Sequence, residues 1–300
     1  MQQLEKKKYC YFAFGLVFSS ELELTEFLPG EGTADVNIIL DEVPTNIENP
    51  IEVFDEYQLS ETEFLLFKKV ANYHVKYGNT ITIQIHEYDI NRIKAYLMAI
   101  IMGALLIQRG LIPIHGSSIV INGKAIVFTG RSGAGKSTLC AALRKKSYEY
   151  MSDDITAISI NSDGVPVVIP AYPQQRLSRH AAKMLGYNVT NLELRMPEKK
   201  FFIESDVQYN KESVPLFAIF EICKENVRCV DIIKASGTDK LKGIMSNMYY
   251  SVIRKRMGIP PEFFIKLTHL ANSVHYYYLL RPFWKRSTEE QIRLVMETIR

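Results

Sequence analysis

Short apolar runs separated by turn-forming stretches fill the first 89 residues. Pro29-Gly30-Glu31-Gly32 and Pro44-Thr45-Asn46 are such stretches. Because β-branched and aromatic residues are enriched in the runs, four strands are predicted: Tyr9–Phe18, Val36–Leu40, Glu63–Phe67 and Thr80–Ile85. No cluster of carboxylates, cysteines or histidines indicates chemistry there. Residues 1–89 are therefore predicted to be a β-rich region for scaffolding or substrate docking.

From residue 90 onward the pattern interleaves strands with helices. Ala95–Ile107 carries no charge, but a membrane span needs about twenty apolar residues, so we expect a buried helix. The predicted strands are Ile112–Ile121, Lys124–Thr129, Tyr148–Met151, Ile155–Ile160, Leu216–Ile222 and Cys229–Ile233. The predicted helices are Thr138–Lys146, Ser178–Gly186, Thr238–Arg256 and a carboxyl-terminal helix that begins with the capping box Ser287-Thr288-Glu289-Glu290. Residues 90–300 are thus predicted to be an α/β or α+β catalytic domain.

Asn122-Gly123 separates two apolar runs, which is the strongest short-range signal for a β-hairpin. The strand over 124–129 is therefore expected to pair antiparallel with the strand before it. This arrangement departs from the usual doubly wound nucleotide-binding fold. It also brings His115, at the far start of the hairpin, back toward the residues that follow Thr129.

The segment after that strand matches G-x-x-x-x-G-K-[ST], the phosphate-binding loop, with Gly130, Arg131, Ser132, Gly133, Ala134, Gly135, Lys136 and Ser137. Glycines let backbone N–H groups face phosphate oxygens. Lys136 supplies a charge for the β- and γ-phosphates, and the Ser137 hydroxyl is a ligand for Mg²⁺. The helix that follows adds its N-terminal partial charge. The pattern predicts a nucleoside triphosphate site; the alternative is a glycine-rich turn that matches by accident.

Asp153 and Asp154 end a predicted strand shortly after the loop. Carboxylates there suit metal binding and proton abstraction, since a Mg²⁺–nucleotide site needs oxygen ligands nearby. Side chains alternate along a strand, so the two need not share a role. The alternative is a solvated acidic turn.

The composition bears on which kinds of partner the chain binds. The chain has 300 residues, 47% of them hydrophobic, which suffices for a large core, and a net charge of only +3, which gives no argument for nucleic acid or an anionic membrane. Its four cysteines are scattered and form no C-x-x-C pair. With no apolar leader after the polar start, a cytoplasmic protein with free thiols is expected.

The combination of His115-Gly116, the hairpin, the phosphate loop and Asp153-Asp154 resembles the nucleotide half of HPr kinase/phosphorylase, which is related in fold to ATP-dependent phosphoenolpyruvate carboxykinase. The resemblance covers residues 112–160. It implies a phosphoenolpyruvate-carboxykinase-like and HPr-kinase-like fold that uses ATP and Mg²⁺. The later glycine-rich signature linked to phosphorolysis in that family is missing from this sequence.

The layout of the chain is more similar to stand-alone HPr-kinase-like proteins, including kinases of lasso-peptide precursors. The similarity includes a β-rich beginning, the segment Pro173-Gln174-Gln175-Arg176-Leu177 and the ending Val274-His275-Tyr276-Tyr277-Tyr278-Leu279. This resemblance implies a peptide or small protein as substrate.

The resemblance implies roles for the carboxylates and the loop. Asp153 is the expected general base, and Asp154 is expected to assist the metal or hold the geometry, although the two roles could be reversed. Lys136 would hold the β- and γ-phosphates, and Thr138 would flank the α-phosphate.

Two further residues gain roles by the same resemblance. His115 would contact the transferred phosphoryl group or orient Asp153; its alternative is a histidine that satisfies backbone groups. Arg176 would neutralise charge on the γ-phosphate, a task suited to a planar guanidinium. Arg179 and His180 compete for that task, and an ordinary solvated arginine is an equal alternative.

We therefore expect an ATP-dependent kinase that phosphorylates a serine-type hydroxyl on a peptide or small protein. A kinase of a small-molecule hydroxyl is the nearest rival, and a nucleotide-binding sensor or assembly factor without turnover is the rival from another class. Carboxykinase chemistry ranks third, because no additional His/Lys set for Mn²⁺ is recognisable. The sequence leaves ATP or GTP preference open, and it is compatible with a homo-oligomer.

Overall fold

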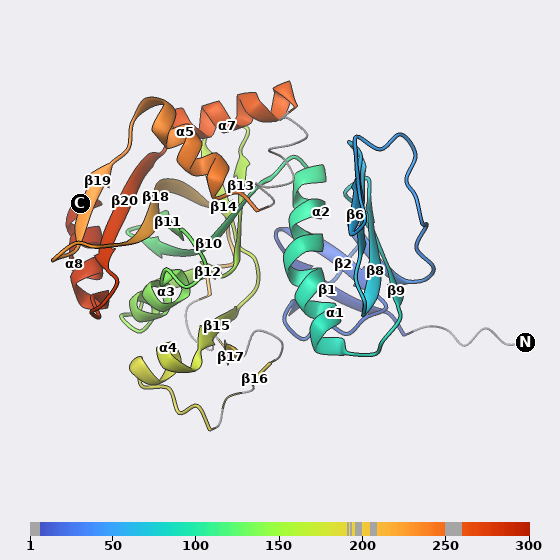
Figure 1. Ribbon diagram of the computed structural model, residues 1–300, viewed down its shortest axis with the longest axis horizontal. Helices are drawn as coiled ribbons and strands as arrows, with labels where there is room; N and C mark the ends of the chain where they lie inside the picture. The colour runs from blue at the N-terminus through green and yellow to red at the C-terminus, as the bar shows by residue number, and fades with distance from the viewer. Residues whose placement is uncertain (1–6, 191, 193, 196–199, 205–208, 250–259) are drawn as a thin grey trace, which may run out of the picture. The chain divides into compact units, whose positions relative to one another are not determined.

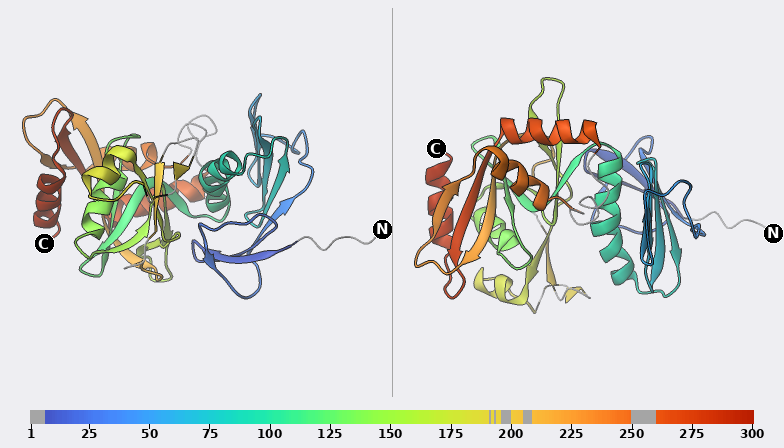
Figure 2. Two further views of the ribbon diagram at one scale, coloured as in Figure 1. Left: turned by 90° about the horizontal axis from the view of Figure 1, so that it is seen from below. Right: turned by 45° about the horizontal axis from the view of Figure 1, so that its top comes forward.

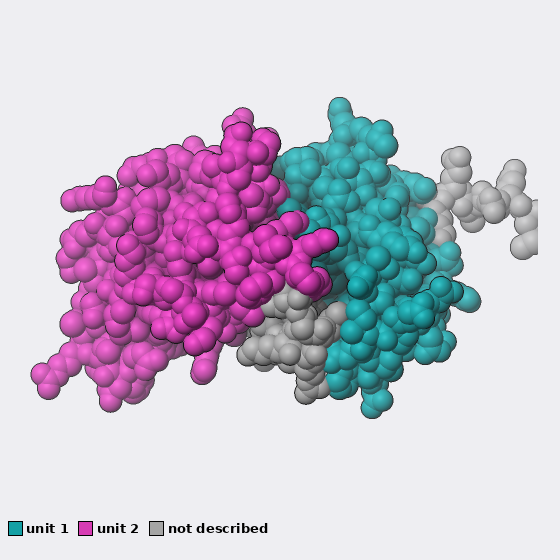
Figure 3. Space-filling view, turned by 90° about the horizontal axis from the view of Figure 1, so that it is seen from above, with its two compact units in different colours: residues 1–111, 252–257 teal, residues 112–251, 258–300 magenta. Residues whose placement is uncertain are grey.

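The computed structural model describes residues 7–190, 192, 194–195, 200–204, 209–249 and 260–300 (Figure 1). The described residues form two compact units, coloured separately in Figure 3. Unit 1 extends to Leu111, and unit 2 begins at Ile112.

Unit 1 contains one sheet with the strand order β3-β1-β2-β4-β9-β8-β7-β6-β5. Its strands are β1 (Tyr9–Ala13), β2 (Leu16–Ser20), β3 (Leu28–Pro29), β4 (Val36–Leu40), β5 (Glu52–Phe54), β6 (Tyr57–Leu59), β7 (Glu63–Phe67), β8 (Ala71–Lys76) and β9 (Thr80–Ile85). The β-rich prediction holds for these residues. The single strand predicted over Tyr9–Phe18 is wrong, because Phe14 and Gly15 both adopt positive φ and turn the chain into a hairpin.

The apolar helix belongs to unit 1. It consists of α1 (Ile90–Tyr96), the π-helical segment η1 (Leu97–Ile101) and α2 (Met102–Gln108). The Tyr73 hydroxyl donates to the Ile93 carbonyl at 3.1 Å, and Gln108 Nε2 donates to the Val75 carbonyl at 3.3 Å. The predicted boundary after residue 89 is therefore corrected to the Leu111/Ile112 junction, since the helix bonds to β8.

This helix, Ile90–Gln108, is also the one helix among the described residues that is long and apolar enough to cross a membrane, with a mean hydropathy of 1.6. The expectation that the apolar stretch is too short to span is not met, because the observed helix has 19 residues. Its hydrogen bonds to β8 are those of a core helix.

Unit 2 is built on a sheet whose pairings run from β10 through β13, β14 and β18 to β11 and back to β10. Its strands are β10 (Ile112–Ile121), β11 (Lys124–Thr129), β12 (Glu149–Ser152), β13 (Ile155–Ile160), β14 (Pro166–Ile169), β18 (Val214–Glu225), β19 (Asp231–Lys234) and β20 (His275–Pro282). A smaller sheet contains β15 (Gln174–Ser178), β16 (Leu194–Arg195) and β17 (Lys200–Glu204).

Helices cover both faces of the larger sheet, as Figures 1 and 2 show. The helices are α3 (Lys136–Arg144), α4 (Arg179–Met184), α5 (Gly237–Ser246), α7 (Pro261–Ser273) and α8 (Thr288–Thr298). Successive residues of β11 enter different cores: Val127 packs with α5 and α7, whereas Phe128 packs with α3 and α8. Period-2 alternation thus buries the strand on both faces, and unit 2 is mixed α/β.

Two further predictions can be compared with the described residues. The hairpin at Asn122-Gly123 is confirmed: both residues have positive φ, and β10 pairs antiparallel with β11. The capping box is wrong, because Ser287 makes no side-chain cap bond and instead accepts from Gln291 Nε2. The helix predicted over Thr238–Arg256 ends at Ser246, and its last residues, 250–256, lie outside the described residues.

Candidate active site

The phosphate-loop segment connects the buried strand β11 to α3. At Gly130 a Cβ would lie 2.6 Å from the Ile222 carbonyl oxygen, and φ is +124°, so only glycine fits there. Lys136 is buried, and its Nζ donates to the carbonyls of Gly130 at 2.8 Å and Arg131 at 3.3 Å. The ammonium group is thus positioned by backbone carbonyls of the phosphate loop itself.

Asp153 is buried and accepts three hydrogen bonds. Oδ1 accepts from Ser117 Oγ at 2.5 Å and from Ser137 Oγ at 2.8 Å, and Oδ2 accepts from the Arg176 backbone N–H at 3.0 Å. Asp153 therefore joins the serine of the phosphate loop to β10 and β15. Because both carboxylate oxygens accept hydrogen bonds, Asp153 is better suited to orienting Ser137 than to acting as a general base.

Asp154 has different surroundings. Its φ of +71° is uncommon for a non-glycine residue. Asp154 Oδ1 lies 3.5 Å from His115 Nδ1, and the Tyr249 hydroxyl lies 3.5 Å from Oδ2. The Asp154 carboxylate thus has longer contacts than that of Asp153 and lines a cavity.

His115 stands beside this carboxylate with a lowered pKa. Burial is the main cause, and the charge of Lys136 adds to it, while Asp154 and Asp153 oppose the shift. The His115 imidazole is therefore neutral at pH 7. The edge of its ring faces Tyr249, with ring centroids 5.5 Å apart.

A cavity of about 390 Å³ extends along the phosphate loop. Its lining includes most of the predicted site: His115, Ser132, Gly133, Gly135, Lys136, Ser137, Thr138, Asp154, Arg176 and His180. Ala134 is buried and faces away into the core with α3. Arg179, the other predicted competitor, packs its guanidinium over Phe201 at 5.5 Å from the ring centroid.

The cavity is also lined by cations that sequence reasoning missed. Arg281 Nη1 donates to the Ala134 carbonyl at 2.9 Å, while Arg281 Nε is buried and has no hydrogen-bond partner among the residues that the structure describes. Lys224 pairs in register with Arg281, because β18 and β20 are parallel neighbours. Arg286 lines the same cavity. A sequence signal existed: Lys224 and Arg281 each follow an apolar run, and ligands gather at the carboxyl ends of parallel strands.

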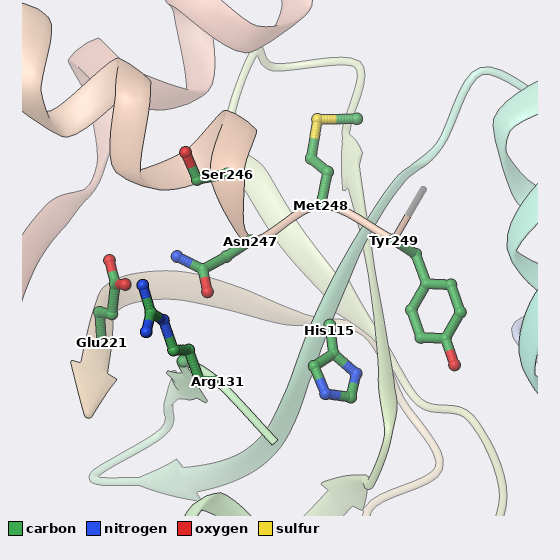
Figure 4. A pocket seen from close by; sticks show the side chains of 8 residues that line it. His115, Arg131, Glu221, Ser246, Asn247, Met248 and Tyr249 are labelled. Carbon is green, nitrogen blue, oxygen red and sulfur yellow. The ribbon is translucent and has the colours of Figure 1, made fainter. Parts of the chain in front are cut away.

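A second cavity of about 400 Å³ adjoins the start of the phosphate loop (Figure 4). Gly130, Arg131 and His115 line it, together with Glu221 of β18 and the segment 246–249 after α5. The segment is fixed to β10, since the His115 N–H donates to the Asn247 carbonyl and the Tyr249 N–H donates to the Pro113 carbonyl, both at 2.8 Å. His115 lines both cavities.

The residues at Ser137 fit a Mg²⁺ ion that accompanies a nucleotide. Mg²⁺ prefers hard oxygen ligands and usually takes one or two from protein side chains, the rest coming from phosphates and water. Ser137 Oγ and Asp153 Oδ1 lie 2.8 Å apart and offer such oxygens. In the described part of the chain, no group of three His, Cys, Asp or Glu side chains forms a larger metal centre.

No family model matches this sequence, and no curated protein matches it. Among solved structures, the Hpr(Ser) kinase/phosphatase from Coxiella burnetii aligns with 13% sequence identity and a TM-score of 0.32. The alignment covers 62% of this chain and 93% of that chain. What this chain does must therefore be inferred from its own residues.

Proposed function

We propose that this chain is a kinase that transfers the γ-phosphoryl group of a nucleoside triphosphate, ATP by the resemblance noted above, to a hydroxyl group. One observation carries the proposal: the serine of a phosphate-loop motif is hydrogen-bonded to the buried carboxylate of Asp153 at 2.8 Å, while Asp154 and His115 line the cavity beside it. Phosphoryl transfer needs these parts, namely a phosphate cradle, an oxygen set for the metal and an acid–base group.

The proposed reaction is a phosphoryl transfer between two oxygen atoms. The acceptor oxygen forms a bond to the γ-phosphorus, the bond from that phosphorus to the β,γ-bridging oxygen breaks, and its electron pair leaves with the nucleoside diphosphate. The hydroxyl proton passes to a carboxylate of the enzyme. The products are a phosphate monoester and the diphosphate.

We assign the base role to Asp154 and the metal-side role to Asp153, the reverse of the first expectation. The contacts of the Asp154 carboxylate to His115 and Tyr249 are both 3.5 Å, longer than those of Asp153. A more loosely held carboxylate is better able to accept the proton of the acceptor hydroxyl. Neutral His115 would orient the Asp154 carboxylate without pairing its charge. Asp153, with three short hydrogen bonds, would keep Ser137 aimed at the phosphates.

Lys136 would neutralise charge on the β- and γ-phosphates, and Arg176 and Arg281 would face the same cavity as additional cations. When bound, Mg²⁺ supplies charge neutralisation for the triphosphate, and Ser137 and Asp153 would hold it.

The acceptor is proposed to be a serine-type hydroxyl of a peptide or small protein, with a lasso-peptide precursor as one candidate. A small-molecule hydroxyl is the second candidate, favoured by the modest size of the cavity around Glu221, about 400 Å³. A nucleotide sensor would share the loop but would need neither carboxylate for its output.

The test compares Asp153→Asn and Asp154→Asn with labelled ATP, Mg²⁺ and serine-containing peptides or small hydroxyl compounds. We expect Asp154→Asn to lose phosphotransfer by about 10²–10⁴-fold, the usual contribution of a positioned acid–base group. Asp153→Asn should lose phosphotransfer as well, because Ser137 loses the carboxylate that orients it. Only Asp153→Asn should also weaken binding of the Mg²⁺–nucleotide, measured by calorimetry.

Asp163→Asn is the matched control, since Asp163 lies in an exposed turn of unit 2. Full activity in Asp154→Asn would remove the proposed base. Tight nucleotide binding with no transfer to any acceptor, in every variant, would favour the sensor.

A further inference from the structure

The cavity shown in Figure 4 has an acidic end that the transfer step does not use. Glu221 lies on β18, and its Oε2 accepts from the Tyr276 hydroxyl at 2.5 Å. Burial raises the pKa of the Tyr276 phenol, so this group remains a donor. Asn247 Nδ2 donates to the same phenolic oxygen at 3.1 Å. The carboxylate is therefore fixed in place by a buried neighbour.

This network leaves acceptor atoms available to a ligand. Asn247 Nδ2 is used by Tyr276 and by the Gly243 carbonyl, which leaves Asn247 Oδ1 as an acceptor at the cavity. Among the described residues Glu221 forms no ion pair, and the Arg131 guanidinium is the cation drawn beside it in the same cavity (Figure 4). A fixed carboxylate beside an amide oxygen is a site for a positively charged donor.

The sheet register sets the separation between this acidic end and the reacting end. Gly116 pairs with Thr129, and Thr129 pairs with Glu221, so two strand spacings separate β10 from β18. Each spacing is about 4.8 Å, which places the two backbones roughly 10 Å apart. A cation bound at Glu221 would therefore lie several ångströms from a hydroxyl held at His115, as a lysine ammonium does from a neighbouring serine.

We propose that the acceptor binds in this cavity with its hydroxyl at His115 and a primary ammonium group at Glu221. The inference rests on the proposed hydroxyl kinase activity and narrows its substrate class to hydroxyl acceptors with a nearby cationic group, such as a serine next to a lysine. His115 lines both cavities, so it marks the place where an acceptor from one could meet a phosphoryl group from the other. Arg131, at the start of the phosphate loop, would turn to the triphosphate.

The test uses three capped dipeptides that differ only in charge: acetyl-Ser-Lys-amide, acetyl-Ser-Gln-amide and acetyl-Ser-Glu-amide. Their dissociation constants are measured by ligand-observed NMR with the full chain, Mg²⁺ and a non-hydrolysable ATP analogue. We expect the lysine peptide to bind about tenfold more tightly than the glutamine peptide, and the glutamate peptide to bind most weakly. Glu221→Gln should remove the difference between the lysine and glutamine peptides.

Glu225→Gln is the matched control, because Glu225 lies on the same strand, is exposed and lines neither cavity. Its preference should equal that of the unmodified chain. Equal binding of the lysine and glutamine peptides by the unmodified chain would overturn the proposal, and so would a preference that survives in Glu221→Gln. The charge series on the unmodified chain decides the matter even if Glu221→Gln fails to fold.

A parallel assay of phosphopeptide formation separates the two hypotheses. A charge preference in binding without any phosphopeptide would support the cationic site and contradict the kinase. Phosphorylation of all three peptides with equal kcat/KM and equal affinity would support the kinase and contradict the cationic site.

Discussion

Buried polar groups serve different purposes in the two units. In unit 1 they satisfy one another: His74 Nε2 lies 2.7 Å from Glu63 Oε2, and Lys94 Nζ lies 3.0 Å from Glu26 Oε2. In unit 2 the charged groups of Lys136 and Asp154 line a cavity, and the Lys136 ammonium donates to two backbone carbonyls of the phosphate loop.

Charged groups that stabilise the fold and charged groups that bind a ligand differ in what surrounds them. A buried pair whose members compensate each other supports the fold, and removing one member leaves a costly unpaired charge. A buried charge that faces a cavity and is held by backbone groups retains its capacity for a ligand. The same substitution should therefore cost stability in unit 1 and activity in unit 2.

The largest expected effect is in unit 1. Lys94→Met removes the ammonium group that lies 3.0 Å from the Glu26 carboxylate, whose side chain is 2% exposed. Breaking such a buried pair typically costs about 3–5 kcal/mol. Urea unfolding should show this loss, while phosphotransfer per folded molecule stays unchanged. Lys69→Met is the control, since Lys69 pairs with Glu87 at the surface and should change stability by less than about 1 kcal/mol.

Next is Lys136→Ala in unit 2. Removing a positioned charge from developing phosphate charge should lower kcat/KM by about 10²–10³-fold. The free energy of unfolding should change less than in Lys94→Met, because the hydrogen bonds of Lys136 to Gly130 and Arg131 end on neutral backbone carbonyls. Lys124→Ala, an exposed lysine of the β10–β11 hairpin, should match the unmodified chain. A large stability loss with activity retained would reverse the distinction between the units.

Arg281→Gln should have a smaller effect. The guanidinium donates to the Ala134 carbonyl, and its buried Nε, which has no hydrogen-bond partner among the described residues, would donate to a phosphate oxygen under the proposed function. Losing a hydrogen bond to a charged group costs about 1.5–3 kcal/mol, so nucleotide affinity should fall by about ten- to a hundredfold. Calorimetric titration with ATP and Mg²⁺ measures this. Unchanged affinity would remove Arg281 from the phosphate site.

The smallest effect concerns pH. Burial is the leading cause that lowers the pKa of both His115 and His74 from 6.5 in the folded chain. The unfolded chain then binds more protons as pH falls through 6.5, so stability decreases toward acidic pH until the folded groups also protonate. Thermal unfolding at about pH 7.5 and about pH 5.5 should show a smaller decrease for His115→Asn than for the unmodified chain.

His74→Asn tests whether a buried histidine of unit 1 affects stability without affecting activity. It should also reduce the acid loss of stability, yet leave the pH profile of phosphotransfer unchanged. His115→Asn should alter that profile, because the acidic limb of the unmodified enzyme should reflect protonation of His115 beside Asp154, with a midpoint below 6.5. An identical profile in both variants would contradict the role of His115.

The sequence by itself determined the local features. Asn122-Gly123 has the turn chemistry of a hairpin, and the phosphate loop has its glycines and lysine at fixed spacing, because both depend on the backbone freedom of adjacent residues. The apolar runs located β4, β7 and β9 of unit 1 and β10, β11, β12, β13, β18 and β19 of unit 2, and they missed the shorter strands β3, β5 and β6.

Only the tertiary structure decided which carboxylate faces the cavity. Ser117 and Asp153 are 36 residues apart, and the Gly116 N–H that holds the Asp154 carbonyl comes from another strand, so no local pattern could reveal these bonds. The same holds for Glu221 and Tyr276, which the parallel pairing of β18 and β20 brings together. Register between distant strands sets which side chains converge, because it depends on long-range packing rather than on adjacent residues.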